Sequence, residues 1–244
     1  MLHLKKNNTI DAITRHSRRF TMKLHTDLSL QANAFFTAST WVPSPIKEVT
    51  RKMLERDGGE IATATSLVNY ESDSYFSSHV HTGGEEFLVL EGIFADEHGD
   101  YPVGTYMRNP VGTSHAPVVK DGCMILVKLG QYQDGDNTPV HIDTQTQPVS
   151  NDSTRHGVQF QLLHTFKHEV VRLEQWQANQ TIELENQGGI EILVIDGSFI
   201  HEHTNYEKFD WLRLPIGDSL QATIGQHNCT VWIKTGHHIH QIQA

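Results

Sequence analysis

The sequence repeats itself, and this repeat is the strongest constraint on the fold. After a shift of 105 residues, Gly83–Gly92 (GGEEFLVLEG) aligns with Gly188–Gly197 (GGIEILVIDG) without a gap. The same shift superposes further residues, namely Phe94 on Phe199, Tyr101 on Tyr206, Arg108 on Arg213, Pro110 on Pro215 and Gly112 on Gly217. One register kept over this length indicates a tandem duplication of a single structural unit. We place the seam near residues 145–155 and expect one unit at 23–145 and the other at 146–244.

Both units consist of short strand-type segments bounded by turn residues, and helical periodicity is scarce. Thr50–Glu55 fits a short helix or a strand equally well, and the polar stretch Gln133–Thr154 is typical of a linker. Short strands at this spacing predict an all-β sandwich or barrel. The expected strands are Ile61–Tyr70, Glu86–Phe94, Thr105–Met107, Cys123–Leu129, Val158–Phe166, Glu169–Leu173, Ile190–Ile200 and Cys229–Lys234.

Charge and composition exclude several classes of protein. A net charge of −10 opposes binding to a phosphate backbone, so we expect no nucleic-acid partner. No segment approaches the ~20 apolar residues of a membrane-spanning helix, so we expect no membrane partner. Residues 1–22 carry five basic side chains against one acid. We interpret them as a disordered basic leader, or as residues that precede a true translation start at Met22. Two cysteines cannot build a disulfide framework, and no export signal is present, which favours a cytoplasmic location.

Histidine is the one over-represented residue type, with 17 copies in 244 residues. The first unit contains His79–Glu85 (HVHTGGE) and Pro110–His115 (PVGTSH). Residues two apart in a strand share a face, so the first two histidines can reach one metal ion together. The glycine pair permits a bend toward Glu85, and the Pro-x-Gly turn lets the last histidine arrive from a neighbouring strand. Three imidazoles and a carboxylate suit divalent iron, manganese, nickel, zinc or copper.

These two segments resemble the paired motifs of the cupin superfamily, HxHxxxExxxxxxG at His79–Gly92 and GxxxxxPxGxxH at Gly104–His115. Their surroundings are similar to the ChrR-like cupins over residues 61–130, and as a bicupin over 41–236. The resemblance implies tandem jelly-roll barrels and one divalent ion in the first barrel. Its implied ligands are His79, His81, Glu85 and His115. Two non-ligand positions depart from the family pattern, where an expected glycine is Asp73 and an expected asparagine is Val119.

The second unit has lost all four ligands. The shift of 105 residues places Leu184, Asn186, Ile190 and Leu220 at the ligand positions. We therefore expect a second barrel without an equivalent metal site. Its expected role is packing against an open face of the first barrel, or binding an apolar ligand where a metal ion would otherwise lie.

Other features carry weaker predictions. We expect Cys123 and Cys229 to be buried, inert thiols, and Trp41–Pro45 to form an extended segment that docks on the first barrel. Five further histidines could form a second metal site, but we expect them to lie on a solvated surface. They are His201, His203, His237, His238 and His240. Three residues are candidates for a layer behind the metal ligands or for a pocket wall, namely Tyr106, Arg108 and Lys128.

Two functions of different classes follow from the resemblance. In ChrR-like proteins the cupin is the C-terminal half of a zinc-dependent anti-sigma factor, which implies a regulatory or sensor module responding to a small molecule or oxidant. Zinc is then the most expected metal, with iron, manganese or nickel as alternatives. No cysteine precedes Cys123, so the sigma-binding half with its HxxxCxxC-type zinc motif is missing from this sequence, and a direct anti-sigma role would need a partner chain.

The alternative is a metal-dependent enzyme. Related cupins use the same ligand set on Fe(II) to cleave small diketones or phenolic ketones with O₂, and Glu85 could dissociate from the metal and act as a base. For either function we expect a small-molecule ligand in the first barrel. A regulatory protein partner fits the first function, and the chain is expected to be a monomer or a homodimer.

Overall fold

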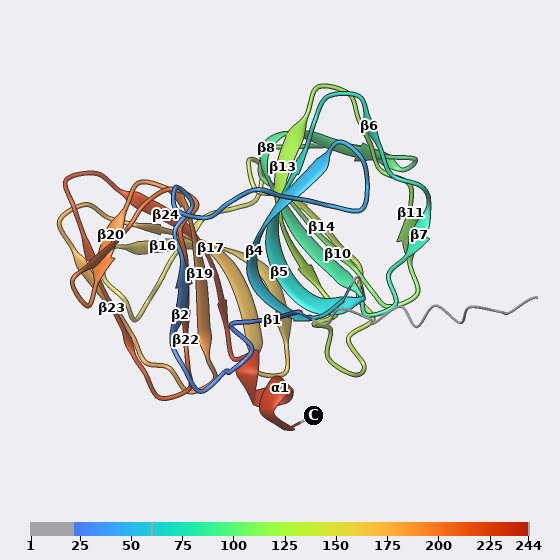
Figure 1. Ribbon diagram of the computed structural model, residues 1–244. Helices are drawn as coiled ribbons and strands as arrows, with labels where there is room; N and C mark the ends of the chain where they lie inside the picture. The colour runs from blue at the N-terminus through green and yellow to red at the C-terminus, as the bar shows by residue number, and fades with distance from the viewer. Residues whose placement is uncertain (1–21, 60, 244) are drawn as a thin grey trace, which may run out of the picture.

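The computed structural model describes residues 22–59 and 61–243. Almost all of its regular structure is β-strand, and the strands form two barrels that lie side by side (Figure 1). The predicted all-β fold with two repeated units is therefore confirmed. The predicted basic leader lies, apart from Met22, outside the described residues. Within them, no helix is both long and apolar enough to cross a membrane.

The first barrel has a large antiparallel sheet and two short strand pairs opposite it. In spatial order the sheet contains β1 (Met22–Leu24), β4 (Val49–Gly58), β5 (Ala62–Tyr70), β13 (Cys123–Leu129), β8 (Glu85–Asp96), β10 (Thr105–Asn109) and β14 (Val140–Asp143). Beside it, β3 (Val42–Pro43) pairs with β4, and β9 (Gly99–Pro102) pairs with β8. The short pairs are β7 (His79–Val80) with β11 (Ser114–His115), and β6 (Ser74–Tyr75) with β12 (Val118–Val119).

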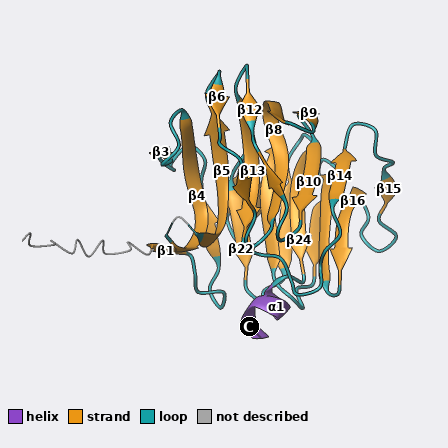
Figure 2. Cartoon of the chain, turned by 90° about the vertical axis from the view of Figure 1, so that its right-hand side faces the viewer, coloured by secondary structure: helices purple, strands orange, loops and turns teal. Residues whose placement is uncertain are grey.

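The second barrel repeats this plan. Its large sheet contains β15 (Ser150–Asn151), β16 (Val158–Phe166), β17 (Glu169–Trp176), β24 (Cys229–Thr235), β19 (Ile190–Asp196), β22 (Trp211–Leu214) and β2 (Ala32–Ala34). Its smaller sheet contains β18 (Thr181–Leu184), β23 (Leu220–Ile224), β20 (Phe199–His201) and β21 (Thr204–Tyr206). The chain ends in the short helix α1 (His238–Gln243) at the base of the molecule (Figure 2).

The hydrophobic core has three parts, because the central strands are buried on both faces. In β13, Cys123, Ile125 and Val127 point into the first barrel, while Met124 and Leu126 point toward the second. In β24, Val231 lies in the core of the second barrel and Trp232 in the shared core. The shared core joins the two large sheets face to face, so the second barrel covers the first, as the packing interpretation expects.

The chain departs from the sequence-based expectations at several places. Thr50–Glu55 is part of strand β4 and is not helical. The predicted linker Gln133–Thr154 contains β14 and β15, which extend the two large sheets, so the linker prediction was wrong over these strands. Strand β2, which falls in the range expected for the first barrel, pairs with β22 of the second. The lead-in segment docks as predicted, because β3 pairs with β4.

Reciprocal ion pairs connect the barrels. Lys234 Nζ lies 2.7 Å from Glu86 Oε2, and Lys128 Nζ lies 2.6 Å from Glu191 Oε2. The two glutamates are equivalent repeat positions, and so are the two lysines. All four side chains are almost fully buried. Each contact therefore pairs a lysine and a glutamate at equivalent positions of the two barrels, as the two contacts across the two-fold axis of a symmetric dimer would.

The residues proposed as a layer behind the metal ligands belong to this interface instead. Arg108 donates from Nη1 to Glu86 Oε2 at 2.8 Å and from Nη2 to Asp136 Oδ2 at 2.6 Å. Tyr106 donates to Glu86 Oε1 at 3.0 Å, and Lys128 pairs with Glu191. The placement of Tyr106, Arg108 and Lys128 beside the metal was wrong, because these strands are buried on both faces and each residue points to the face shared with the second barrel.

Candidate metal centre

The four predicted ligands come together through local features of the chain. His79 in β7 and His115 in β11 are direct cross-strand partners, and His81 follows two residues after His79. The chain then bends at Gly84, which has φ +77°, and Glu85 opens β8. A Cβ atom on Gly84 would lie 2.3 Å from the Tyr132 ring, so no larger residue fits this bend.

The ligand atoms of His79, His81, Glu85 and His115 lie within 4.8 Å of one another. Among the described residues, they are the group of His, Cys, Asp and Glu side chains close enough to hold one metal ion. The ring centroids of the three histidines are 4.7–5.1 Å apart. Glu85 Oε2 lies 3.3 Å from His81 Nε2 and 3.6 Å from His115 Nε2.

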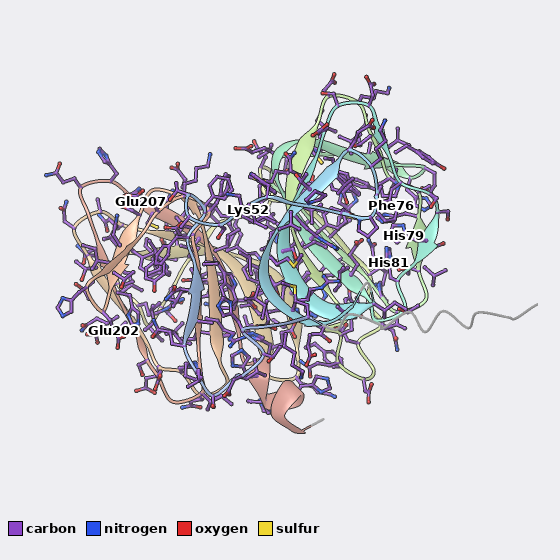
Figure 3. The ribbon with its side chains drawn as sticks, viewed as in Figure 1. Lys52, Phe76, His79, His81, Glu202 and Glu207 are labelled. Atoms are coloured by element: carbon purple, nitrogen blue, oxygen red, sulfur yellow. The ribbon has the colours of Figure 1, made fainter. Side chains whose placement is uncertain are left out.

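The cluster sits at the outer side of the first barrel. His79 and His81 project there next to Phe76, away from the second barrel (Figure 3). His81, Glu85 and His115 are buried, while His79 is partly exposed. The site is therefore reached from solvent beside His79 and is shielded on its other sides.

Each histidine has an acceptor at Nδ1, which leaves Nε2 directed at the cluster. His81 Nδ1 lies 3.0 Å from Thr113 Oγ1, and His115 Nδ1 lies 3.1 Å from Asp96 Oδ2. His79 Nδ1 lies 3.3 Å from the carbonyl oxygen of Ser77. Because the Thr113 hydroxyl donates to the Pro110 carbonyl at 2.7 Å, its oxygen accepts the proton of His81 Nδ1. Acceptors of this kind hold the ring and tautomer in which Nε2 can bind a metal ion.

The electrostatics also fit a cation. Burial lowers the pKa of His81, so its ring is neutral and can offer a lone pair. Its Nε2 is buried and makes no hydrogen bond, despite lying close to Glu85. Asn109 donates to Glu85 Oε2 at 3.1 Å and orients the carboxylate. A buried ring nitrogen without a partner is costly, and a divalent ion at the common point of the four ligands would satisfy it.

The two departures from the family pattern leave the site intact. Asp73 adopts the left-handed φ of +60°, the conformation for which a glycine is favoured. Val119 is buried in the core of the first barrel and pairs with Ser74. Spacing alone did not identify Asp96, Thr113 and Asn109 as partners of the ligands. A motif marks the ligands but not the acceptors that approach them from other strands.

The second barrel uses the equivalent positions for packing. Ile190 and Leu220 are buried in its core, and Leu184 packs against that core. Asn186 is a structural residue whose side chain donates to the carbonyl of Pro215 at 2.6 Å and accepts from the backbone N–H of Gly189 at 2.6 Å. These contacts join two turns that are joined in the first barrel by the contact between His81 and Thr113.

Several other predicted features can be compared with the structure. Cys123 and Cys229 are buried, and burial raises the pKa of each thiol to about 12, as expected of inert thiols. The solvated surface predicted for the other histidines was wrong at His201, His237 and His238, which are buried. His238 packs over Gly189 as Tyr132 packs over Gly84, so the repeat continues to the end of the second barrel.

Comparison with known proteins supports the family resemblance. A profile described as ChrR Cupin-like domain matches the chain twice, at residues 31–133 and 137–239. The chain belongs to the ChrR cupin-like family. Both barrels of this ChrR cupin-like protein are thus recognised as copies of one domain. No curated protein sequence matches the chain significantly.

Solved structures share the two-barrel fold. A provisionally named dioxygenase from Nostoc punctiforme has a TM-score of 0.67 and 14% identity, with 88% of this chain and 82% of that chain covered. Protein Ylba from Escherichia coli has a TM-score of 0.67 and 13% identity, with 91% and 95% covered. The E. coli pirin YhhW, solved with nickel(II), has a TM-score of 0.63 and 12% identity, with 84% and 98% covered. At these identities the comparison establishes the fold.

Proposed function

We propose that this protein is a regulatory or sensor module that holds one divalent ion in its first barrel and responds there to a small molecule or an oxidant. The observation that carries metal binding is the convergence of four ligand atoms within 4.8 Å, with each histidine held through Nδ1. Four ligands of this type can close a tetrahedral zinc site, which makes Zn(II) the first expected metal. The family membership supports the regulatory role.

The barrel interior beside the ligands favours binding over acid–base catalysis. The aromatic rings of Phe94 and His115 lie 5.8 Å apart, so the apolar core reaches the site. The ionisable groups of this core keep their protons, because burial raises the pKa of Tyr70, Tyr101 and Cys123. Within the described residues, this core supplies no separate acid–base pair. The chain's own residues bind and orient a ligand and exclude water from it.

A metal-dependent dioxygenase is the second candidate. The partly exposed His79 leaves the site open to a small substrate, which this function requires. A redox-active ion such as Fe(II) would supply the electron transfer to O₂ that zinc cannot. The Nostoc punctiforme protein with the same fold carries a provisional dioxygenase name, which supports this candidate. A small diketone or phenolic ketone is the expected substrate class.

Elemental analysis of the untagged protein, purified under low oxygen from cells grown without added metal, separates the two functions. About one zinc per chain would support the regulatory proposal, and the next step would be a search for a protein partner. About one iron per chain would support the dioxygenase, to be followed by oxygen consumption with diketones and phenolic ketones.

The variants His81→Ala and His115→Ala should lose most of the bound metal while the fold survives. His98→Ala, an exposed histidine of the same barrel, is the matched control and should keep it. Full metal content in the double ligand variant would refute the proposed site.

A further inference from the structure

Tyr132 connects the bend at the metal centre to the contact between the two barrels. Its ring packs over Gly84, the residue at which the chain turns into Glu85. Its hydroxyl donates to the backbone carbonyl of Glu85 at 3.2 Å. Burial raises the pKa of this hydroxyl, so it keeps the proton that it donates. Tyr132 therefore contacts both residues of the bend and fixes the backbone from which the carboxylate ligand projects.

Arg108 in turn holds the ring of Tyr132. Its Cζ lies 4.4 Å from the ring centroid, a favourable contact between a cation and an aromatic ring. On β10, Arg108 is the cross-strand partner of Glu86. The next residue, Asn109, is the partner of Glu85 and donates to its carboxylate at 3.1 Å. Arg108 can therefore act on Glu85 by two routes, one through a ring contact and one along its own strand.

The second barrel fixes the orientation of Arg108. Glu169 on β17 accepts from Arg108 Nη1 at 3.1 Å, and it also lies 3.0 Å from Lys234 Nζ on β24. Asp136 accepts from Arg108 Nη2 at 2.6 Å and lies 3.1 Å from Nε2 of His164 on β16. All five side chains are buried. Charged groups in such surroundings are held firmly by their partners, because a buried charge without a partner is costly.

The second repeat lacks this connection, and it also lacks the metal ligands. Arg213 stands at the position of Arg108, but it donates to Glu55 of the first barrel. His238, which packs in the place of Tyr132, has no hydrogen-bond partner at either ring nitrogen in the described part of the chain. The connection therefore occurs in the repeat that keeps the ligands, which indicates a role in metal binding and not only in packing.

We propose that the second barrel sets the metal affinity of the first, with Arg108 and Tyr132 as positioning residues that hold Glu85 in place. The proposal rests on the metal binding proposed above and gives the second barrel a part in it. Because coupling between two parts of a protein is reciprocal, an ion bound at Glu85 also stabilises the contact between the barrels. The metal centre and the contact then respond to each other, as a regulatory module requires.

The Zn(II) affinity of the full-length chain, measured by competition with a chromogenic chelator, tests this proposal. Tyr132→Phe keeps the ring over Gly84 and removes the hydroxyl that binds the Glu85 carbonyl. Glu169→Gln removes a charge that holds Arg108 from the second barrel. Each variant should bind Zn(II) about 3- to 30-fold more weakly than the wild-type chain.

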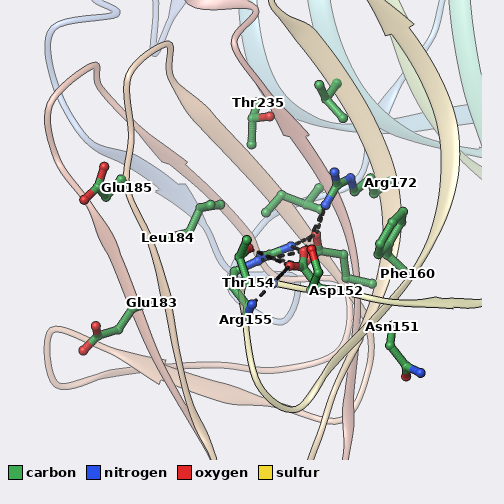
Figure 4. A pocket seen from close by; sticks show the side chains of 14 residues that line it. Asn151, Asp152, Thr154, Arg155, Phe160, Arg172, Glu183, Leu184, Glu185 and Thr235 are labelled. Carbon is green, nitrogen blue, oxygen red and sulfur yellow. Dashed lines mark hydrogen bonds and ion pairs between the residues drawn. The ribbon is translucent and has the colours of Figure 1, made fainter.

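The matched control for the second barrel is Glu174→Gln. Glu174 lies on the same strand as Glu169 and is equally buried. Its partner is Arg155, in a cluster beside a hollow of the second barrel (Figure 4). Both substitutions remove a buried carboxylate, so both should lower the stability of the metal-free chain in urea. Glu174→Gln should keep the wild-type Zn(II) affinity, and equal affinities of the two variants would overturn the proposal.

Two further measurements separate positioning from a general loss of structure. In the Glu85→Gln chain, Tyr132→Phe should weaken Zn(II) binding by less than about threefold, because the residue on which Tyr132 acts is already changed. The visible absorption bands of the Co(II) form depend on ligand geometry, and they should shift in Tyr132→Phe but not in Glu174→Gln.

Full additivity of the Glu85 and Tyr132 substitutions would overturn the proposal, and so would wild-type Co(II) bands in Tyr132→Phe. A wild-type Zn(II) affinity in Tyr132→Phe or Glu169→Gln would overturn this proposal while leaving the metal centre in place. A wild-type chain that binds neither ion would overturn the metal centre and this proposal together.

Discussion

Replacing Thr113 by valine should weaken metal binding without removing a ligand. Valine keeps the shape of threonine but cannot accept the proton of His81 Nδ1, which now lies 3.0 Å from the hydroxyl oxygen. That N–H would then be unsatisfied at a ring that is only 5% exposed, at a cost of ~1–3 kcal/mol. The neutral ring can avoid this cost by moving its proton to Nε2, which removes the lone pair for the metal. Loss of such a partner lowers metal affinity about 10- to 100-fold.

Competition with a chromogenic chelator measures this change for Zn(II) and Ni(II). The control is Thr82→Val, at an exposed threonine next to His81 in the sequence, which should bind metal like the wild-type chain. Urea unfolding of both variants shows whether the barrel is intact. If Thr113→Val binds metal within about twofold of the control, well short of the effect expected for such a partner, then the hydrogen bond to Nδ1 does not position His81, and the reasoning fails.

Two further predictions concern stability. Lys234→Met removes the cation that lies 2.7 Å from Glu86 and 3.0 Å from Glu169. The uncompensated buried charge should lower the free energy of unfolding by ~3–5 kcal/mol. Urea unfolding measures this change, and an effect no larger than that of Lys208→Met, at an exposed lysine, would contradict the prediction. Burial lowers the pKa of His238 to about 2, so below its ordinary pKa of ~6.5 only the unfolded chain takes up the proton, and stability falls as the pH decreases. The variant His238→Phe cannot take up this proton. As the pH decreases from about 7 to about 5, its free energy of unfolding should therefore rise by about 2 kcal/mol relative to that of the wild-type chain. Identical pH dependence of urea unfolding in the two proteins would exclude a buried neutral His238.

The repeat and the ligand spacing were sufficient to predict the fold class and the four clustered side chains. Both depend on local rules, because successive side chains of a strand point to opposite faces and a Pro-x-Gly turn reverses the chain. Position 73 shows the same logic, since an aspartate there adopts the left-handed backbone expected of a glycine. The backbone conformation that the motif requires at this position is therefore present in the structure.

The direction of Arg108 and Lys128 could not be predicted in this way. Their strands are buried on both faces, so the hydrophobic pattern does not alternate and cannot tell the barrel interior from the face shared with the second barrel. The burial of His238 was missed because the helix that begins there has six residues and gives no periodic signal. Strand β2 has three residues, too few to indicate which sheet they join.

The two ion pairs between the barrels bear on how such a chain can change over generations. In a dimer of identical subunits, one codon change alters both symmetric contacts, and it alters both active centres as well. Here Glu86 and Glu191 are encoded separately, and so are Lys128 and Lys234. A substitution in one barrel therefore does not change the equivalent residue of the other barrel. This independence lets the second barrel carry Leu184 and Ile190 where the first keeps His79 and Glu85, while both retain the lysine and the glutamate that hold them together.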